Sequence, residues 1–111
     1  MDAGDLHYRV AFDRRAEIDD GHGNTRSGWQ EQFQCRAAYR HLRGGESVMA
    51  GRLAGRHAQI ITVRASSQTR QIGTDWRVRD ARTGEEFNIR DVTHETDRQW
   101  ISLLVERGVA A

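Results

Sequence analysis

The chain has 111 residues, of which 37% are hydrophobic and 30% are charged, and its formal net charge is only +1. This length suits one compact domain, so we treat residues 1–111 as a single domain. The balanced composition excludes an intrinsically disordered chain, no apolar run approaches the roughly 20 residues of a membrane helix, and the small net charge argues against a dedicated binder of duplex DNA.

The basic residues are all arginine: the chain has 17 arginines and no lysine. A GC-rich genome would produce this bias. So would a role in interfaces, because the planar guanidinium group makes bidentate contacts and stacks on aromatic rings. The single cysteine, Cys35, cannot form a disulfide within the chain, which fits folding in a reducing cytoplasm. The first residues are acidic and lack an apolar core, so we expect no signal peptide.

Two segments in the first part of the chain alternate apolar and polar side chains with a period of two. Leu6 to Phe12 and Phe33 to Tyr39 therefore each predict a strand with one buried face. The segment between them, from Asp19 to Gly28, is polar, rich in glycine and without periodicity. It predicts a long, mobile loop.

Residues 44–55 interrupt the β pattern. Val48, Met49 and Leu53 can share one face of a short helix, but the glycines around them weaken that helix by up to about 1 kcal/mol each relative to alanine. We therefore expect one short helical insertion here, either a helix of two turns or a loop that becomes ordered on binding.

Four more strands are expected after the insertion, at residues 59–65, 76–79, 86–92 and 98–106. β-Branched residues dominate the first of them, and Thr83-Gly84 supplies the turn between the second and the third. Six short strands, the last three in a meander, predict a mainly β fold: a small six-stranded antiparallel β-barrel or sandwich. Closure of the sheet would remove its exposed edge strands.

No group of residues has the spacing of a catalytic or metal site. The five histidines are scattered, and none pairs with a cysteine or a second histidine at a metal-ligand spacing. Cys35 occupies an inward-facing position, where a thiol is structural and poorly reactive. Glu85 and Glu86 are adjacent in a predicted strand, so they point to opposite faces and cannot form a catalytic dyad. We expect no catalytic residues, no metal, no cofactor and no enzymatic activity.

The insertion is the segment for which we predict a functional role. Methionine and arginine are enriched in protein interfaces, and an insertion with little intrinsic order is often a binding element. The alternative is a helix that plugs one end of the barrel and buries its apolar residues. The candidate residues for an interface or channel loop are Arg43, Glu46, Val48, Met49, Arg52, Leu53 and Arg56.

A second candidate surface lies in the second half of the chain. Arg77 and Arg79 share one face of a predicted strand, and Arg82 is close by in the sequence. These arginines form either a solvated outer face or an interface patch that meets acidic residues of a neighbouring subunit.

Short blocks of residues follow one another through nearly the whole chain. They are 3–10, 20–23, Trp29, 37–40, 44–46, 60–64, 76–78, 87–89 and 97–104. In this order and spacing they resemble the head-tail joining proteins of long-tailed bacteriophages, a family of adaptors, stoppers and head completion proteins. Gly44-Gly45-Glu46 matches the block that begins the helical insertion of the family, and Arg64 matches the arginine that ends the following strand. The chain departs from the family in its lack of proline and lysine.

The resemblance implies a small β-barrel and a structural role at the neck of the virion. It implies self-association into a ring, with sixfold symmetry favoured over twelvefold, and transient passage of double-stranded DNA through the lumen. The implied partners are a portal-side adaptor protein and a tail-side terminator or tail tube protein, with no membrane. The family's adaptors are more helical, so we favour a stopper that lines or closes the DNA channel. The particle, assembled in the bacterial cytoplasm, would be a phage, a prophage remnant or a gene transfer agent.

The alternative function is a small nucleic-acid-binding β-barrel. Such a barrel needs exposed aromatic side chains on which bases stack, whereas Tyr8, Phe12, Phe33, Tyr39 and Phe87 occupy core-like positions in the alternation. A channel that passes DNA should not grip it, because each phosphate contact opposes sliding. The small net charge therefore fits the neck protein, in which a few arginines face the lumen and the others form pairs between subunits.

Overall fold

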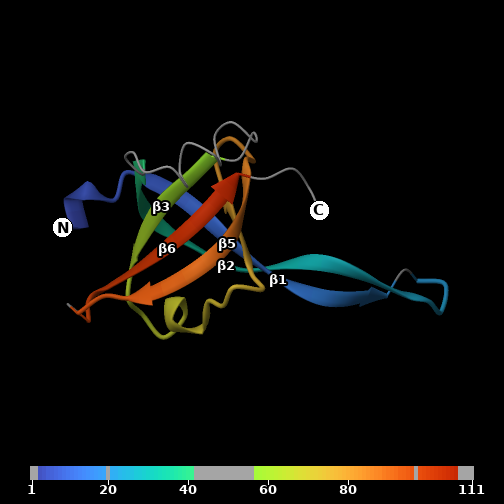
Figure 1. The fold of residues 1–111 in the computed structure, drawn as a ribbon. Helices are drawn as coiled ribbons and strands as arrows, with labels where there is room; N and C mark the ends of the chain where they lie inside the picture. The colour runs from blue at the N-terminus through green and yellow to red at the C-terminus, as the bar shows by residue number, and fades with distance from the viewer. Residues whose placement is uncertain (1–2, 20, 42–56, 97, 108–111) are drawn as a thin grey trace.

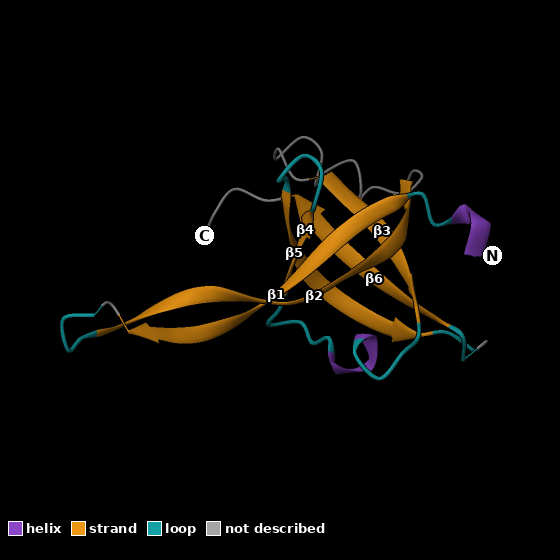
Figure 2. Cartoon of the chain, turned by 180° about the vertical axis from the view of Figure 1, so that it is seen from behind, coloured by secondary structure: helices purple, strands orange, loops and turns teal. Residues whose placement is uncertain are grey.

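The computed structural model describes residues 3–19, 21–41, 57–96 and 98–107. Within these ranges, six strands form one antiparallel sheet in the order β1-β2-β3-β6-β5-β4, and β4 pairs with β1, so the sheet closes into a barrel (Figures 1 and 2). The elements are η1 (Ala3–Asp5), β1 (Tyr8–Asp19), β2 (Thr25–His41), β3 (His57–Arg64), η2 (Thr69–Gln71), β4 (Arg77–Asp80), β5 (Glu86–His94) and β6 (Trp100–Arg107). The mainly β fold, the antiparallel barrel and the meander of the last three strands are confirmed. The expected helix at residues 44–55 lies outside the described residues.

The inward-facing apolar residues of the strands fill the barrel. Because successive side chains of a strand point to opposite faces, alternate residues meet inside the barrel. β3 and β6 are paired in a register that sets Ile61 opposite Leu103 and Val63 opposite Ile101. Complete burial of each such side chain contributes about 1.5–3 kcal/mol. The fully buried residues of largest volume are Phe12, Phe87, Ile61, Ile101, Leu103, Val10, Val63, Val78 and Val105.

The connection from β3 to β4, which includes η2, lies at one end of the barrel (Figure 1). Its side chains Ile72 and Trp76 are buried and belong to the core cluster. The buried Thr69 holds the connection in place, since its hydroxyl donates to the carbonyl of Arg64 at 2.8 Å and accepts from the backbone N–H of Ser66 at 2.7 Å. This connection therefore also closes part of the core.

The first two strands differ most from the sequence-based expectation. β1 runs to Asp19 and β2 begins at Thr25, and the two remain paired residue by residue as far as Asp19 and Thr25. The predicted long loop from Asp19 to Gly28 is therefore too long: its start agrees with the end of β1 to within one residue, but residues 25–28 belong to β2. The placement of Tyr8 in the core was also wrong, because its side chain is 45% exposed.

Candidate interaction surface

The hairpin of β1 and β2 extends beyond the barrel as a two-stranded arm (Figures 1 and 2). We call the paired segments Arg14–Asp19 and Thr25–Gln30 the arm. β1 pairs with β4 only from Val10 to Asp13, and β2 pairs with β3 only from Ala37 onward, so no other strand among the described residues lies along either outer edge of the arm. Exposed strand edges present unpaired N–H and C=O groups that can receive another chain.

The arm leaves the barrel at a β-bulge. Phe12 faces Phe33 in the register, but Asp13 faces Glu31, so Gln32 is an extra residue in β2. A bulge bends its strand and increases the local twist. It therefore accounts for the change of direction between the barrel wall and the arm.

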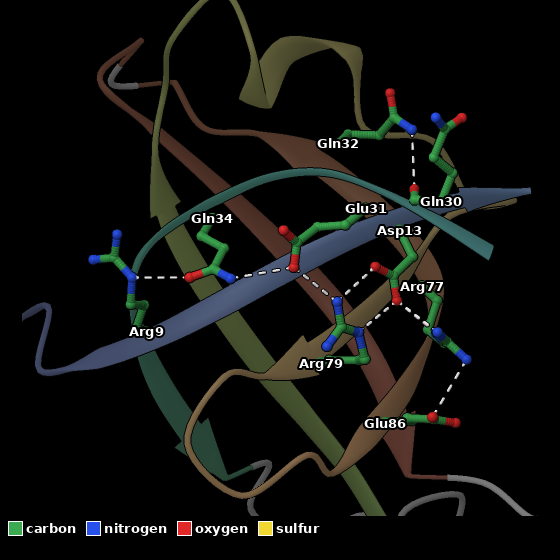
Figure 3. Close-up of polar contacts among 9 residues, drawn as sticks. All are labelled: Arg9, Asp13, Gln30, Glu31, Gln32, Gln34, Arg77, Arg79 and Glu86. Atoms are coloured by element: carbon green, nitrogen blue, oxygen red, sulfur yellow. Dashed lines mark hydrogen bonds and ion pairs between the residues drawn. The ribbon is translucent and has the colours of Figure 1, made fainter.

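A buried carboxylate holds this junction (Figure 3). The side chain of Asp13 is only 3% exposed, and its Oδ2 accepts hydrogen bonds from Nη2 of Arg77 at 2.7 Å and from Nε of Arg79 at 2.7 Å. The two arginines also contact acids on the surface, Glu86 at 3.3 Å from Arg77 and Glu31 at 2.9 Å from Arg79. We call these five residues the Asp13 network. It ties β4 and β5 to the base of the arm.

The charges in the Asp13 network stabilise one another. Burial alone would raise the pKa of Asp13, but the hydrogen bonds from Arg79 and Arg77 outweigh it and hold this pKa below its ordinary value of 3.8. The hydrogen bond to Asp13 in turn raises the pKa of Arg79. The carboxylate is therefore ionised at neutral pH.

Trp29 extends the same junction into the arm. The guanidinium carbon of Arg15 lies 4.9 Å from the centre of the Trp29 ring system, and that of Arg77 lies 4.7 Å from it. Arg15 is the cross-strand partner of Trp29, whereas Arg77 comes from β4. Cation–π contacts of this kind contribute about 0.5–1 kcal/mol at exposed sites. The orientation of the arm relative to the barrel is therefore set by side chains from both.

A second polar contact joins the barrel wall to the turn between β4 and β5. The hydroxyl of Tyr39 donates to Oδ2 of Asp80 at 2.9 Å, and the other carboxylate oxygen accepts from the backbone N–H groups of Arg82 and Thr83. Burial and the bond to Asp80 raise the pKa of Tyr39. The ring of Tyr8 stacks on Tyr39 with 4.4 Å between centroids. This pair therefore forms a rigid, partly exposed aromatic surface.

The described residues contain no metal site, no membrane-spanning helix and no reactive thiol. Among residues 3–19, 21–41, 57–96 and 98–107, no three histidine, cysteine, aspartate or glutamate side chains are grouped to hold a metal ion. No helix within these ranges has the length and apolar character to cross a membrane. Burial raises the pKa of the Cys35 thiol to about 11, which keeps it protonated at neutral pH.

Comparisons with known proteins give the family. A family model described as phage head completion protein matches residues 1–108. The chain belongs to this family. No curated protein matches the chain.

Two solved structures share the fold of this head completion protein. The solution structure of a protein from Shigella flexneri 2a is 18% identical with a TM-score of 0.72, and the match covers 100% of both chains. A chain from the virion of a native gene transfer agent particle is 22% identical with a TM-score of 0.62, and the match covers 96% of this chain and 97% of that one. At these identities the likeness concerns the fold. Family membership identifies the protein as a structural component of the virion.

The predicted interface residues fall into two groups. Arg43, Glu46, Val48, Met49, Arg52, Leu53 and Arg56 lie outside the described residues. Arg77 and Arg79 do share one face of β4, and both meet acids of their own chain in the Asp13 network. Arg82 is exposed in the turn after β4.

Sequence reasoning missed Asp13 and Trp29, which position the arm. Asp13 lies 64 residues before Arg77 and 66 before Arg79, so its pairing depends on closure of the barrel. One signal was present: Asp13 continues the outward-facing row of the first strand directly after the buried Phe12. One strand carries an acid on its outer face, and another carries two arginines on its outer face. This pattern predicts an ion pair only if the two strands are known to be neighbours.

Proposed function

We propose that this head completion protein is a stopper at the neck of a tailed particle. Copies of it form a ring between the portal-side adaptor and the tail-side terminator or tail tube protein, and the ring lines or closes the DNA channel. The observation that carries the proposal is the match to the head completion family from residue 1 to residue 108. A sixfold ring is favoured over a twelvefold one, and the protein has no enzymatic role.

The shape of the subunit supports a role in a ring. A barrel supplies a rigid wall, and an arm that extends from it offers a means of reaching the next subunit (Figure 2). Closed rings arise when one surface of a subunit binds a different surface of the next copy. The arm and the barrel wall are two such surfaces.

The charge distribution supports a channel that does not grip DNA. Arg77, Arg79, Arg90 and Arg107 are each paired with an acid of the same chain. An arginine that is paired with an acid attracts phosphate less than an unpaired arginine does. Fewer contacts to phosphate mean a lower affinity for DNA, and therefore less resistance to sliding. Within this proposal, Arg43, Arg52 and Arg56 belong to the loop that faces the channel, and Arg82 contacts a neighbouring protein.

Electron microscopy of particles from a strain that lacks the gene tests this function. We expect DNA-filled or leaky heads beside complete, unattached tails, and we expect restoration of tailed particles when the gene is supplied from a plasmid. Normal tailed particles in the deletion strain would contradict the proposal.

The channel loop is tested separately. The triple variant Arg43→Glu, Arg52→Glu and Arg56→Glu should reduce infectious or transducing particles or release packaged DNA. A control with the same change of charge at the exposed residues Arg70, Arg90 and Arg98 should do so much less. Equal titres from the two triple variants would contradict the assignment of the loop to the channel.

A further inference from the structure

The barrel wall opens where β2 and β3 separate. Their pairing ends at Ala37 and Val63, although both strands continue past these residues. The gap contains a pocket of about 330 Å³, lined by Leu6, Cys35, Arg36, Arg64, Ala65, Ser66, Gln68 and Thr69. We call this gap the seam. No described strand pairs with the β2 edge beside it, so the seam combines a strand edge that can receive another chain with a pocket that is partly apolar.

Like charges meet at the seam. If the ladder continued by one residue beyond Ala37 and Val63, Arg36 would face Arg64. On the other side of β2, Arg36 is the direct cross-strand partner of Arg9. Like charges directly opposite each other destabilise a pair of strands, so the arginines favour an acidic neighbour at this point over continued pairing of β2 with β3. Arg36 and Arg64 form no ion pair with the described part of the chain, so this part supplies neither arginine with an acidic partner.

The inner and outer faces of the barrel wall differ in chemical character at the seam. Ala37 and Val63 are fully buried, and Cys35 packs against the core. Because side chains alternate, Arg36 and Arg64, which are exposed, lie on the outer face. A strand that enters the seam therefore needs an apolar residue on its inner face and acidic residues on its outer face.

The arm carries such a strand. In β1, Ala16 and Ile18 are partly buried, whereas Glu17 and Asp19 between them are exposed. Ile18 lies over Gly28 on the opposite strand, where an added Cβ would come within 2.3 Å of its Cδ1 atom. The outer edge of β1 along these residues is unpaired. The stretch therefore offers free backbone groups, an apolar residue on one face and two acids on the other.

We propose that residues Ala16–Asp19 of one subunit's arm add as a strand to the β2 edge in the seam of a second copy. Ile18 enters the pocket, Glu17 and Asp19 lie beside Arg36 and Arg64, and backbone hydrogen bonds extend the sheet, as in recognition by strand addition. A protein occupant is favoured over DNA because Leu6, Cys35 and Ala65 give the pocket an apolar part that suits an isoleucine side chain. The contact joins two different surfaces, so successive copies can close into a ring. This inference rests on the proposed function, and it names the contact that would hold the ring together.

Cross-linking within particles tests the contact. The variant Ile18→Cys should form a disulfide with Cys35 of a second copy when particles from the complemented deletion strain are oxidised. The oxidation is run at about pH 9, to offset the protonation of the buried thiol. Denaturing gels should show a ladder of linked copies, and peptide mass spectrometry should find residues 18 and 35 joined. The matched control Glu17→Cys, which points to the opposite face, should not link to Cys35.

The outcomes separate this inference from the proposed function. If the Ile18→Cys protein is present in tailed particles but residues 18 and 35 do not join, the contact is wrong and the neck assignment stands. If tailed particles contain none of the protein, both are wrong. A ladder with the 18–35 link supports both.

A charge exchange gives an independent readout. The arm variant Glu17→Arg/Asp19→Arg and the seam variant Arg36→Glu/Arg64→Glu each place like charges at the contact, which opposes binding. Each alone should lower the particle titre by roughly tenfold or more, while co-expression of the two should restore it, because opposite charges then meet in both directions. Loss of packaged DNA in the seam variant that the arm variant does not rescue would overturn the proposal in favour of a DNA contact.

Discussion

The substitution Asp13→Asn removes the charge at the base of the arm and keeps the shape of the side chain. The carboxylate accepts four hydrogen bonds, two from Arg77 at 2.9 and 2.7 Å and two from Arg79 at 2.7 and 3.0 Å. Removal of one partner of a buried ion pair costs about 3–5 kcal/mol. Each arginine keeps a second acid, Glu86 for Arg77 and Glu31 for Arg79. We therefore expect a loss at the lower end of this range, a fall of about 3 kcal/mol in the free energy of unfolding.

Urea denaturation followed by tryptophan fluorescence measures this cost, and one of the three tryptophans, Trp29, lies at the junction. An unfolding entropy of about 2.1 cal/mol/K per residue converts 3 kcal/mol into a fall in Tm of roughly 13 °C. Asp75→Asn, at an exposed position, is the matched control and should change the free energy of unfolding by less than about 0.5 kcal/mol.

The pH dependence gives the same prediction a second test. The pKa of Asp13 in the folded state lies below its ordinary value of 3.8. The ionised carboxylate therefore makes its full contribution to the free energy of unfolding at a pH well above 3.8. The contribution is lost as the pH falls below about 4 and through the lowered folded-state pKa. The difference in stability between the wild type and Asp13→Asn should therefore shrink in this acid range. A difference below about 1 kcal/mol at neutral pH, or one that stays constant down to about pH 2, would refute the role of the buried carboxylate.

Three further predictions concern the barrel. Tyr39→Phe removes the hydrogen bond to Asp80 and should cost about 1 kcal/mol in urea denaturation, since Asp80 keeps two backbone donors; a neutral substitution would show that the bond contributes nothing. Gly84→Ala should destabilise the turn between β4 and β5 by about 1 kcal/mol, because Gly84 has φ of +78° and its amide donates to Asp80; an unchanged Tm would contradict this. Cys35 should react with iodoacetamide at about pH 8 on the order of 100-fold more slowly than a free thiol, because burial raises its pKa to about 11; labelling as fast as a small-molecule thiol would contradict the buried position.

The barrel could be predicted from the sequence because the pattern that marks each of its strands lies within the residues of that strand. Ile61 and Val63, or Ile101, Leu103 and Val105, recur with a period of two, and a strand with such an apolar face requires a core to cover it. The ranges 59–65 and 98–106 accordingly agree with β3 and β6 to within two residues at each end.

The arm was missed for the converse reason. Beyond Asp13 the two strands have no core beneath them, so only the short alternation of Ala16 and Ile18 with acids marks them, and Gly28 extends the loop pattern of Gly21 and Gly23, which lie in the turn itself. The arm is held by cross-strand contacts such as Arg15 with Trp29 and by Arg77 from a distant strand. A single sequence does not reveal such contacts until the neighbours in the sheet are known.

The candidate site was predicted only in part. The shared face of Arg77 and Arg79 followed from their spacing, but their acid partner lies on a strand that is distant in the sequence. The seam and its pocket arise from the point at which two strands stop pairing. That point is a property of the pairing between strands and does not follow from the pattern within either strand.

The most direct test of the account is a reconstruction by electron cryomicroscopy of the neck of complete particles that contain this protein. We predict a ring of copies around the DNA channel, between the portal-side adaptor and the tail, in which each subunit is the six-stranded barrel with its arm directed toward a neighbour. A neck built without this protein, or copies of it located elsewhere in the particle, would contradict the assignment.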